Sequence, residues 1–421
     1  MLPALIEIVP PNRRTDSTIV LPGSKSLTNR ALVLAALAHN PVVLRGALWS
    51  EDTQAMVNCL ERLGFAIRVA DDQAEAANRT LTVYGCGGKI PNAGTPVQPL
   101  ELFVENAGTA ARFLPPLLCL GHGSYRVSGN PRMHERPQAS LIHALRELGY
   151  RIDSPNDHLP AVIHGTGPRQ AASCSVSVED SSQFASALLL SQRIGGWKVS
   201  VIGGNEEELP YVDMTRRLVN DFPWWGGTYD VEPDASNASY FWGAHWLLRE
   251  RGSWITVMPA PHSGMQADQK FHDLIVQQAW RRAYSRSIDL ADSIMTAIVL
   301  APFAPDATLF TDLGRLRVQE CERVKALRTE LAKCGARVEE VNDTLTVHPG
   351  PLSGAEIETY NDHRIAMCFG MLGLRVSDIR LRNPACVRKT FPNFFAKLAE
   401  LGASILDGSS GSRVCGDDLL A

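Results

Sequence analysis

Six stretches of the chain consist almost entirely of small and apolar residues, and each begins at Ser, Asn or Asp. They span residues 24–38, 106–119, 181–190, 236–248, 292–301 and 361–372. The side chains of Ser, Asn and Asp accept hydrogen bonds from the free N–H groups at a helix start. Because the stretches have almost no polar face, the pattern predicts six helices that are buried on most sides.

A second kind of stretch follows each of these and is amphipathic with a period of 3.6 residues. These stretches span residues 52–64, 138–149, 212–222, 269–280, 322–335 and 393–402. Four of them end at a glycine, the residue that best tolerates a left-handed C-terminal cap. Short strand-like segments follow, such as 66–70, 337–341 and 404–406. Any α/β protein alternates in this way, but six buried helices each followed by an amphipathic one favour a structural repeat of strand–helix–strand–helix–strand–strand.

Six such units divide most naturally into two lobes of three. The segment 230–236, between the third and fourth buried helices, is a plausible crossover between lobes. Residues 1–20 form a strand left over before the first unit, which could complete the second lobe. The sequence therefore predicts an α/β protein with one lobe at 21–233 and a discontinuous lobe at 1–20 plus 234–421.

Composition narrows the class of protein. The chain has 421 residues, 45% hydrophobic and 20% charged, which is typical of a globular protein and excludes disordered and fibrous classes. A net charge of −4 gives no reason to expect nucleic acid as a partner. The longest apolar run, 294–303, is shorter than the roughly 18 residues of a membrane span, and no signal segment is expected before Pro11.

Cysteine spacing and the usual binding motifs give no indication of a cofactor. The nine cysteines form no CxxC pair, so we expect buried thiols in a reducing cytoplasm, without a disulfide framework or a metal site. No Walker loop, HExxH or GxSxG motif occurs. Small molecules are the expected partners.

Basic and polar residues gather at the starts of the buried helices. Lys25, Ser26 and Arg30 open the first, Arg112 lies in the second, and Arg364 opens the sixth. A helix N-terminus already carries about half a positive charge, so added cations make sense where a strong anion binds. The alternative is that such an arginine is simply solvated at a helix end. This would explain a single case, but it is a weaker explanation for several basic helix starts at equivalent positions of one repeat.

Two other segments, 130–137 and 388–392, add basic residues to this set. Arg317, Glu320 and Arg323 are spaced i, i+3 and i+6, which predicts base, acid and base on one side of a helical turn. The sequence thus predicts a cleft rich in Lys and Arg that holds at least two anionic groups.

Asp292 and Glu320 are the candidates for proton transfer in this cleft, because a carboxylate among so many cations needs a reason to be there. Structural ion pairing is the alternative reading of both.

Seven segments, in order, resemble the EPSP synthase (3-phosphoshikimate 1-carboxyvinyltransferase) family. They are 21–30 (LPGSKSLTNR), 106–110 (NAGTA), 131–133 (PRM), 181–184 (SSQF), 210–215 (PYVDMT), 360–364 (YNDHR) and 389–392 (KTFP). The resemblance covers nearly the whole chain. It implies an inside-out α/β barrel in two lobes, each of three βαβαββ units, that close on substrate. It also implies transfer of the enolpyruvyl group of phosphoenolpyruvate to the 5-hydroxyl of shikimate 3-phosphate, with release of phosphate.

The resemblance implies roles for individual residues. Phosphoenolpyruvate would be held by Lys25, Gly108, Arg132, Gln183, Arg323, Arg364 and Lys389. The acceptor would be held by Lys25, Ser26, Arg30, Ser181, Ser182, Gln183 and Asp292. Asp292 would take the proton of the attacking hydroxyl, and Glu320 and Lys25 would protonate the enol methylene and the departing phosphate. The herbicide glyphosate would bind where phosphoenolpyruvate does, because Gly108 leaves the space that the family associates with sensitivity.

Three positions depart from the family pattern where the acceptor's phosphate would lie. Glu208 stands at a family serine, and Arg315 and Gln319 stand at a family asparagine and lysine. Arg315 could compensate by pairing with Glu208 or by binding the phosphate, which keeps shikimate 3-phosphate as the expected acceptor. The alternatives are a related enolpyruvyl transferase with an unphosphorylated acceptor and a catalytically silent anion-binding relative. The enzyme is expected to be a cytoplasmic monomer.

Overall fold

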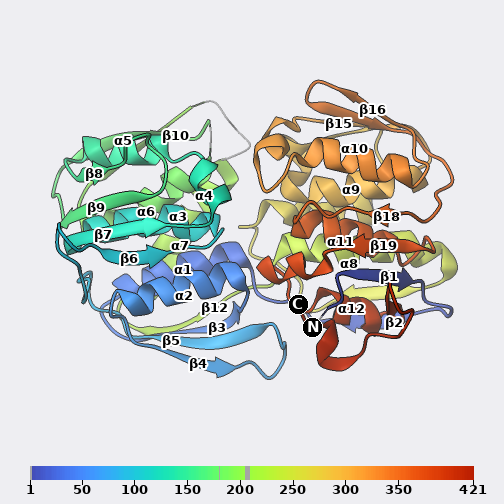
Figure 1. Cartoon of the computed structure of the whole chain (residues 1–421), viewed down its shortest axis with the longest axis horizontal. Helices are drawn as coiled ribbons and strands as arrows, with labels where there is room; N and C mark the ends of the chain where they lie inside the picture. Colours follow the sequence, from blue (N-terminus) through green and yellow to red (C-terminus); the bar gives the residue numbers. More distant parts are fainter. Residues whose placement is uncertain (1, 180, 204–208) are drawn as a thin grey trace. The chain divides into compact units, whose positions relative to one another are not determined.

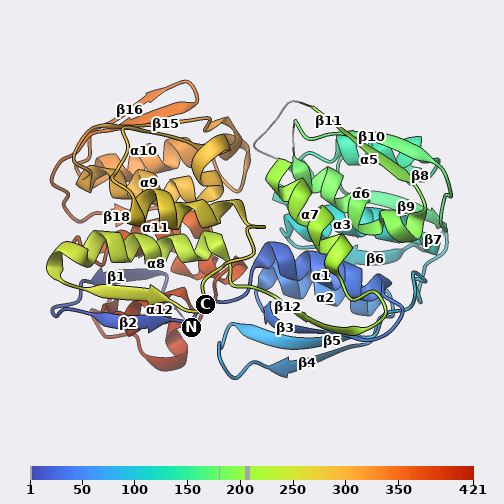
Figure 2. The same cartoon turned by 180° about the vertical axis from the view of Figure 1, so that it is seen from behind.

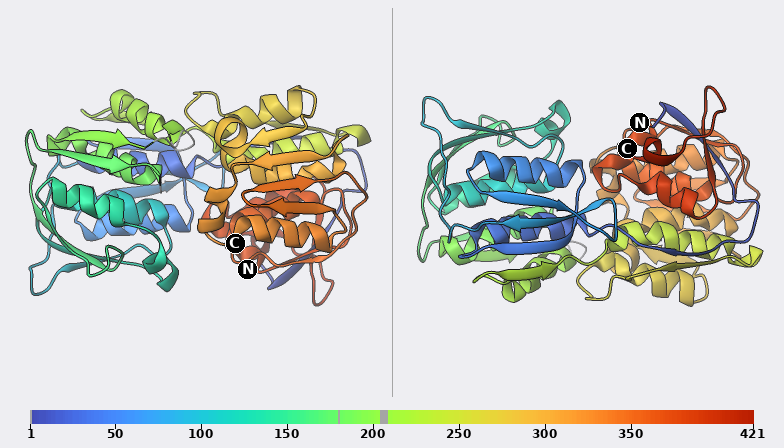
Figure 3. Two further views of the ribbon diagram at one scale, coloured as in Figure 1. Left: turned by 90° about the horizontal axis from the view of Figure 1, so that it is seen from above. Right: turned by 90° about the horizontal axis from the view of Figure 1, so that it is seen from below.

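The computed structural model describes residues 2–179, 181–203 and 209–421, and the chain forms two compact units. One unit comprises residues up to Leu21 together with Pro233–Ala421, and the other comprises Pro22–Glu232 (Figure 1). We refer to them as the terminal unit and the central unit. Both chain ends lie in the terminal unit (Figures 1 and 3).

In the described part of the central unit there are two four-stranded sheets, one two-stranded sheet and seven helices. The first sheet has the order β12 (Gly227–Asp230), β3 (Val42–Leu48), β5 (Asn78–Val83) and β4 (Ile67–Asp71). The second has the order β6 (Leu100–Phe103), β7 (His122–Ser128), β9 (Ala161–Thr166) and β8 (Arg151–Asp153), and β10 (Ser173–Ser177) pairs with β11 (Lys198–Ile202). The helices are α1 (Lys25–Leu37), α2 (Glu51–Arg62), α3 (Gly108–Cys119), α4 (Pro131–Glu135), α5 (Ala139–Glu147), α6 (Ser182–Gly195) and α7 (Leu209–Asp221).

The terminal unit repeats this plan. One sheet has the order β18 (Glu356–Ile357), β19 (Ile379–Arg382), β1 (Leu5–Val9) and β20 (Ser404–Asp407). Another has the order β14 (Ala283–Ser285), β15 (Thr308–Thr311), β17 (Thr344–Val347) and β16 (Val338–Val341), and β13 (Trp254–Val257) pairs with β2 (Asp16–Ile19). Its α-helices are α8 (Ala235–Leu248), α9 (Ile294–Leu300), α10 (Arg323–Lys333), α11 (His363–Leu372) and α12 (Phe394–Glu400).

All four larger sheets share one pairing pattern, which makes the repeat visible in three dimensions. From the first strand of each order to the last, the pairings are parallel, antiparallel and antiparallel. A parallel pair requires a crossover, and in β6–β7, β14–β15 and β18–β19 the crossover is one of the buried helices α3, α9 and α11.

Two strands lie in a different unit from the helix that follows them in the chain. β2 precedes α1 of the central unit, yet it pairs with β13 of the terminal unit. β12 precedes α8 of the terminal unit, yet it pairs with β3 of the central unit. The expected single strand over residues 1–20 is therefore two strands, β1 and β2, separated by Pro10 and Pro11.

The apolar helices form the core of each unit, as their composition predicts. Every residue of α3 and of α9 is buried. In the terminal unit α8, α9 and α11 pack against one another (Figure 2). The glycines that end four amphipathic helices, at 64, 149, 335 and 402, all have φ between 89° and 90°, which confirms the predicted left-handed caps.

One predicted helix is wrong. The stretch 269–280 was expected to be a regular amphipathic helix, but it is a 3₁₀ turn at Ala267–Gln269 followed by a widened π-type turn at His272–Gln277. The side chain of Asp268 is directed inward, where it accepts a hydrogen bond of 2.7 Å from the backbone N–H of Ser293. This buried polar contact takes precedence over the amphipathic pattern, which contains no sign of it.

No helix within the described ranges of the chain is long and apolar enough to cross a membrane.

Replacing Ile298 by Ala should lower the free energy of unfolding by about 2–5 kcal/mol, because the side chain in α9 is fully buried and its loss leaves a cavity. Urea denaturation would measure the change. Ile288→Ala is the matched control, since Ile288 is 66% exposed and should change stability by no more than about 0.5 kcal/mol. Equal losses in the two variants would contradict the buried position of α9.

Candidate active site

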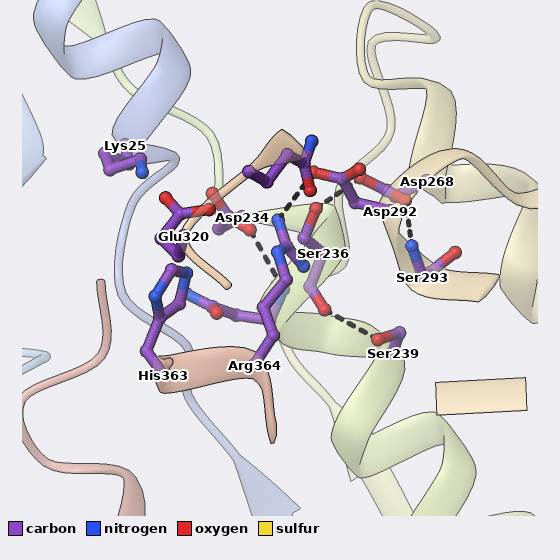
Figure 4. Close-up of polar contacts among 12 residues, drawn as sticks. Lys25, Asp234, Ser236, Ser239, Asp268, Asp292, Ser293, Glu320, His363 and Arg364 are labelled. Atoms are coloured by element: carbon purple, nitrogen blue, oxygen red, sulfur yellow. Dashed lines mark hydrogen bonds and ion pairs between the residues drawn. The ribbon is translucent and has the colours of Figure 1, made fainter. Parts of the chain in front are cut away.

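The starts of the three buried helices of the terminal unit meet through polar side chains. The carboxylate of Asp268 accepts a hydrogen bond from the hydroxyl of Ser236, in the first turn of α8, and one from the N–H of Ser293, just before α9. Asp292 contacts Arg364, in the first turn of α11, at 3.2 Å (Figure 4). The fold therefore brings three helix N-termini, with their partial positive charges, to one place.

Asp292 lies between two guanidinium groups. Its Oδ1 is 3.1 Å from Nη2 of Arg286, and its Oδ2 is 3.2 Å from Nη2 of Arg364. Burial alone would raise the pKa of Asp292, but Arg364 and Arg286 hold that pKa well below its usual range. A guanidinium contact at each oxygen favours the ionised form of this carboxylate. The pKa of the neighbouring Asp268 is raised by burial and by the charge of Asp292.

A second group of charges surrounds Arg323, whose side chain is only 1% exposed. Its Nε donates to Oδ2 of the fully buried Asp362 at 2.7 Å, and its Nη2 donates to Oε2 of Glu320 at 2.8 Å. Burial would lower the pKa of Arg323, but Asp362 and Glu320 raise it well above the ordinary value. Glu320 is held from its other oxygen as well, because Oε1 accepts a hydrogen bond of 2.9 Å from Lys389.

Asp362 joins the two groups. It is the N-cap of α11, and its Oδ1 accepts a hydrogen bond of 2.9 Å from the backbone N–H of Arg364. One carboxylate therefore fixes both Arg323 and the start of the helix that carries Arg364. Of the residues expected in the site, the terminal unit brings together Asp292, Glu320, Arg323, Arg364 and Lys389.

The expected turn with base, acid and base does not form. Arg317 lies in a 3₁₀ turn, Gly314–Val318, and α10 begins only at Arg323, so the two arginines are not on one helical face. Arg317 instead pairs with Glu340 at 3.0 Å and with Asp343 at 2.9 Å. The α-helical spacing of 3.6 residues does not apply here, because the chain changes from a 3₁₀ turn to an α-helix between Arg317 and Arg323.

The three departures from the family pattern have different outcomes. The side chain of Gln319 accepts a hydrogen bond from Nη1 of Arg323, so it takes part in the charge network. Arg315 is partly buried in the 3₁₀ turn before it. Glu208 lies outside the described residues.

In the central unit, Arg30 is buried with uncharged partners. Its guanidinium donates to the hydroxyls of Thr215 at 2.8 Å and Ser186 at 3.2 Å, and to the backbone oxygen of Ser26 at 3.0 Å. Within the described ranges no carboxylate pairs with it, and burial lowers its pKa to about 10. A buried guanidinium that lacks a carboxylate favours an incoming anion.

Lys25, at the start of α1, pairs with Asp52 of α2 at 3.0 Å. At the start of α3, a methyl group added to Gly108 would lie 2.9 Å from Nη2 of Arg136 and 3.3 Å from Nη1 of Arg112. Gly108 therefore lies directly against two arginines, one of them buried.

The other expected binding residues of the central unit lie at the starts of α4 and α6. Ser181 is the N-cap of α6 and accepts a hydrogen bond of 3.2 Å from the N–H of Gln183, and Ser182 is buried beside it. Arg132 is about half exposed in α4 and pairs with Glu135 at 2.6 Å.

Sequence reasoning missed several polar residues of these groups. Asp362 and Thr215 lie inside two of the seven recognised segments, where their position beside cations was the available signal. Asp52 follows directly on the start of an amphipathic helix and looked like a surface residue. Asp268 and Arg286 gave no signal, because each lies in a segment whose helical turns are irregular.

Across the described ranges, no group of three or more His, Cys, Asp or Glu side chains is arranged to hold a metal ion. The carboxylates of the terminal unit contact arginines, a lysine and helix N-termini. This arrangement suits anionic ligands.

Comparison with known proteins shows which sequences and folds this chain resembles. The sequence pattern of EPSP synthase (3-phosphoshikimate 1-carboxyvinyltransferase) matches residues 9–224 and 225–398. The 3-phosphoshikimate 1-carboxyvinyltransferase of Nostoc punctiforme is 33% identical over 430 residues, covering 94% of this chain and 99% of the relative. That of Opitutus terrae is 38% identical over 435 residues, covering 95% and 98%.

The solved structure of EPSP synthase from Acinetobacter baumannii has a TM-score of 0.73 with this chain at 20% identity, covering 95% of this chain and 99% of that one. This likeness confirms the predicted two-lobe α/β fold.

Replacing Asp362 by Asn should lower the free energy of unfolding by about 3 kcal/mol or more, because it leaves the buried charge of Arg323 without its main counter-ion. Urea denaturation would measure the loss. Asp306→Asn removes an exposed pairing with Arg282 and should cost less than about 1 kcal/mol. A loss at Asp362 no greater than that of the control would contradict this account of the pair.

Proposed function

Because the chain belongs to the EPSP synthase (3-phosphoshikimate 1-carboxyvinyltransferase) family, we propose that it transfers the enolpyruvyl group of phosphoenolpyruvate to the 5-hydroxyl of shikimate 3-phosphate and releases phosphate. The observation that carries the proposal is that cations hold two carboxylates: Asp292 lies between Arg286 and Arg364, and Glu320 lies between Arg323 and Lys389. A carboxylate and fixed cations are what addition of a hydroxyl to an anionic enol ester requires.

Asp292 is the general base in this proposal. The acceptor's hydroxyl is a poor nucleophile until its proton is removed, and an ionised, buried carboxylate is suited to receive that proton. Glu320 and Lys25 serve two further proton transfers, to the methylene carbon of the enol and to the departing phosphate. The methyl group formed in the addition gives up a proton as the phosphate leaves, which restores the double bond. Carbon protonation is needed because C2 of the enol ester becomes electrophilic only when the methylene takes a proton.

The cations bind the substrates and stabilise the negative charge of the tetrahedral intermediate. The phosphoenolpyruvate ligands proposed are Lys25, Gly108, Arg132, Gln183, Arg323, Arg364 and Lys389. The acceptor ligands proposed are Lys25, Ser26, Arg30, Ser181, Ser182, Gln183 and Asp292. Arg30 supports the second group most directly, since its uncharged partners leave its charge available to the acceptor's carboxylate.

The acceptor's phosphate is the least familiar part of the site. Gln319 accepts a hydrogen bond from Arg323, so its side chain is already engaged by a group of the protein. Arg315 is then the proposed partner of the phosphate among the residues that depart from the family pattern, because a guanidinium can bind phosphate with two parallel hydrogen bonds. An acceptor without that phosphate is the second candidate, favoured by the absence of a lysine at position 319.

We further propose that the enzyme acts as a monomer in the cytoplasm. Its nine cysteines are free thiols, which fits a reducing compartment. Size-exclusion chromatography with light scattering would give the oligomeric state, and a dimer would contradict this proposal.

Purified protein given phosphoenolpyruvate and shikimate 3-phosphate should release inorganic phosphate, and unphosphorylated shikimate should be a much poorer acceptor. A colorimetric phosphate assay measures both. Preference for shikimate would support the second candidate, and no release with either acceptor would support the catalytically silent reading. Gln319→Lys tests whether the side chain at this position limits use of the phosphorylated acceptor. It should not improve that use, because the new ammonium group would face Arg323.

Arg30→Met should leave the free energy of unfolding unchanged or raise it by up to about 2 kcal/mol, because a buried charge is replaced by an apolar side chain. Acceptor binding should weaken at least tenfold, while phosphoenolpyruvate binding changes little. Urea denaturation and isothermal titration calorimetry would measure the two effects. Destabilisation without loss of acceptor binding would show that Arg30 is structural.

A further inference from the structure

The two arginines that contact Asp292 differ in their access to ligands. The side chain of Arg286 is 4% exposed, whereas that of Arg364 is 15% exposed. They also bind different oxygens of the carboxylate, Arg286 at Oδ1 and Arg364 at Oδ2. Arg364 can therefore turn part of its guanidinium toward a bound anion, while Arg286 is enclosed by protein.

Local backbone geometry fixes Arg286 opposite Asp292, six residues further along the chain. Arg286 is the first residue of a π-type turn, Arg286–Leu290, that the hydroxyl of Ser285 caps by accepting a hydrogen bond of 3.1 Å from Ile288 N–H. Ala291 then reverses the chain with φ 45° and ψ −130°, a conformation that residues with a Cβ rarely adopt. Strain of this kind is retained mainly where it positions a functional group.

We propose that Arg286 is a positioning residue that holds Asp292 through Oδ1, so that Oδ2 receives the acceptor's proton once Arg364 has engaged phosphoenolpyruvate. This inference rests on the proposed function, in which Asp292 is the base and Arg364 a phosphoenolpyruvate ligand. The electrons of the double bond between C2 and the methylene carbon take up a proton at the methylene, and the acceptor's oxygen bonds to C2 as its own O–H bond breaks and that proton passes to Oδ2.

If Arg286 were absent, Asp292 would lose both arginine contacts when Arg364 turns to phosphoenolpyruvate. Its carboxylate would then have less positive charge nearby and would be free to rotate. The other charges that act on Asp292 are Arg323 of α10 and the buried Asp268, which lies before the π-type turn of residues 272–277. Asp312, after β15, also faces Arg286. Burial raises the pKa of Asp312, but hydrogen bonds from Ser285, Ser287 and Thr311 lower it, and so does the charge of Arg286. Arg286 is thus the cation that stays with Asp292 throughout the reaction.

The test compares Arg286→Gln, Arg286→Lys and the control Arg282→Gln in the full chain, with kcat, KM for phosphoenolpyruvate and the pH profile of kcat as readouts. Arg282 is 81% exposed and pairs with Asp306 at 3.1 Å, so its loss removes a nearby positive charge without touching Asp292. Arg286→Gln should lower kcat at least tenfold with KM changed less than twofold. Because the base must be ionised and the removed charge favoured ionisation, the acid limb of kcat should move up by about one pH unit. Arg286→Lys keeps the charge, so it should restore the acid limb while recovering kcat only in part.

A kcat and an acid limb of Arg286→Gln like those of the Arg282→Gln control would overturn the inference. If circular dichroism shows that Arg286→Gln does not fold, Arg286→Lys decides: a lower kcat at unchanged KM supports the inference, and a wild-type kcat overturns it. The proposed function fails separately. In that case the unaltered protein releases no phosphate from phosphoenolpyruvate with shikimate 3-phosphate, or Asp292→Asn keeps the unaltered turnover, and the inference falls with it.

Discussion

Arg323 and Asp362 are two charges taken almost completely out of water, and most of the candidate site in the terminal unit depends on their contact. Each charge needs the other as its partner, because an uncompensated charge in the interior is strongly destabilising. Arg323 then holds Glu320 and Gln319, and Asp362 caps the helix that carries Arg364. A change at this pair would affect both candidate carboxylates, because Glu320 binds Arg323 directly and Asp292 contacts Arg364 at the start of the helix that Asp362 caps.

The repeat places this pair where it has its effect. Each copy of the repeat contains an apolar helix, and in the terminal unit three such helices start from the same small region. Their N-termini contribute partial positive charge, and polar groups of Ser236 (side chain), Ser293 (backbone N–H) and Asp362 (side chain) make hydrogen bonds there. A site for anions therefore follows from the packing of the helices themselves, and the arginines and lysines increase a potential that the fold already has.

Much of this organisation could be read from the sequence. Runs such as 186–190 and 294–303 have no polar face, so burial was the only stable outcome for them, and the glycines at 64, 149, 335 and 402 marked real helix ends. Local patterns fail where a buried polar contact decides the backbone. Asp268 and Arg286 lie in irregular turns whose geometry is set by partners 25 and 6 residues away, and Arg317 was misplaced because the helix type changes beside it. Roles at such positions depend on tertiary contacts that periodicity does not encode.

The strands β2 and β12 have a consequence for how the chain is made. On the ribosome, residues of the central unit emerge in order, and its first sheet is complete only when β12, at 227–230, leaves the exit tunnel. β2 is by then already synthesised but has no partner, because β13, with which it pairs, begins only at residue 254. The terminal unit can therefore complete its sheets only after the central unit, which lies between its two segments in the sequence, has been synthesised. Until β13, β19 and β20 have been synthesised, β1 and β2 lack the strands with which they pair, and unpaired strands are prone to non-native pairing.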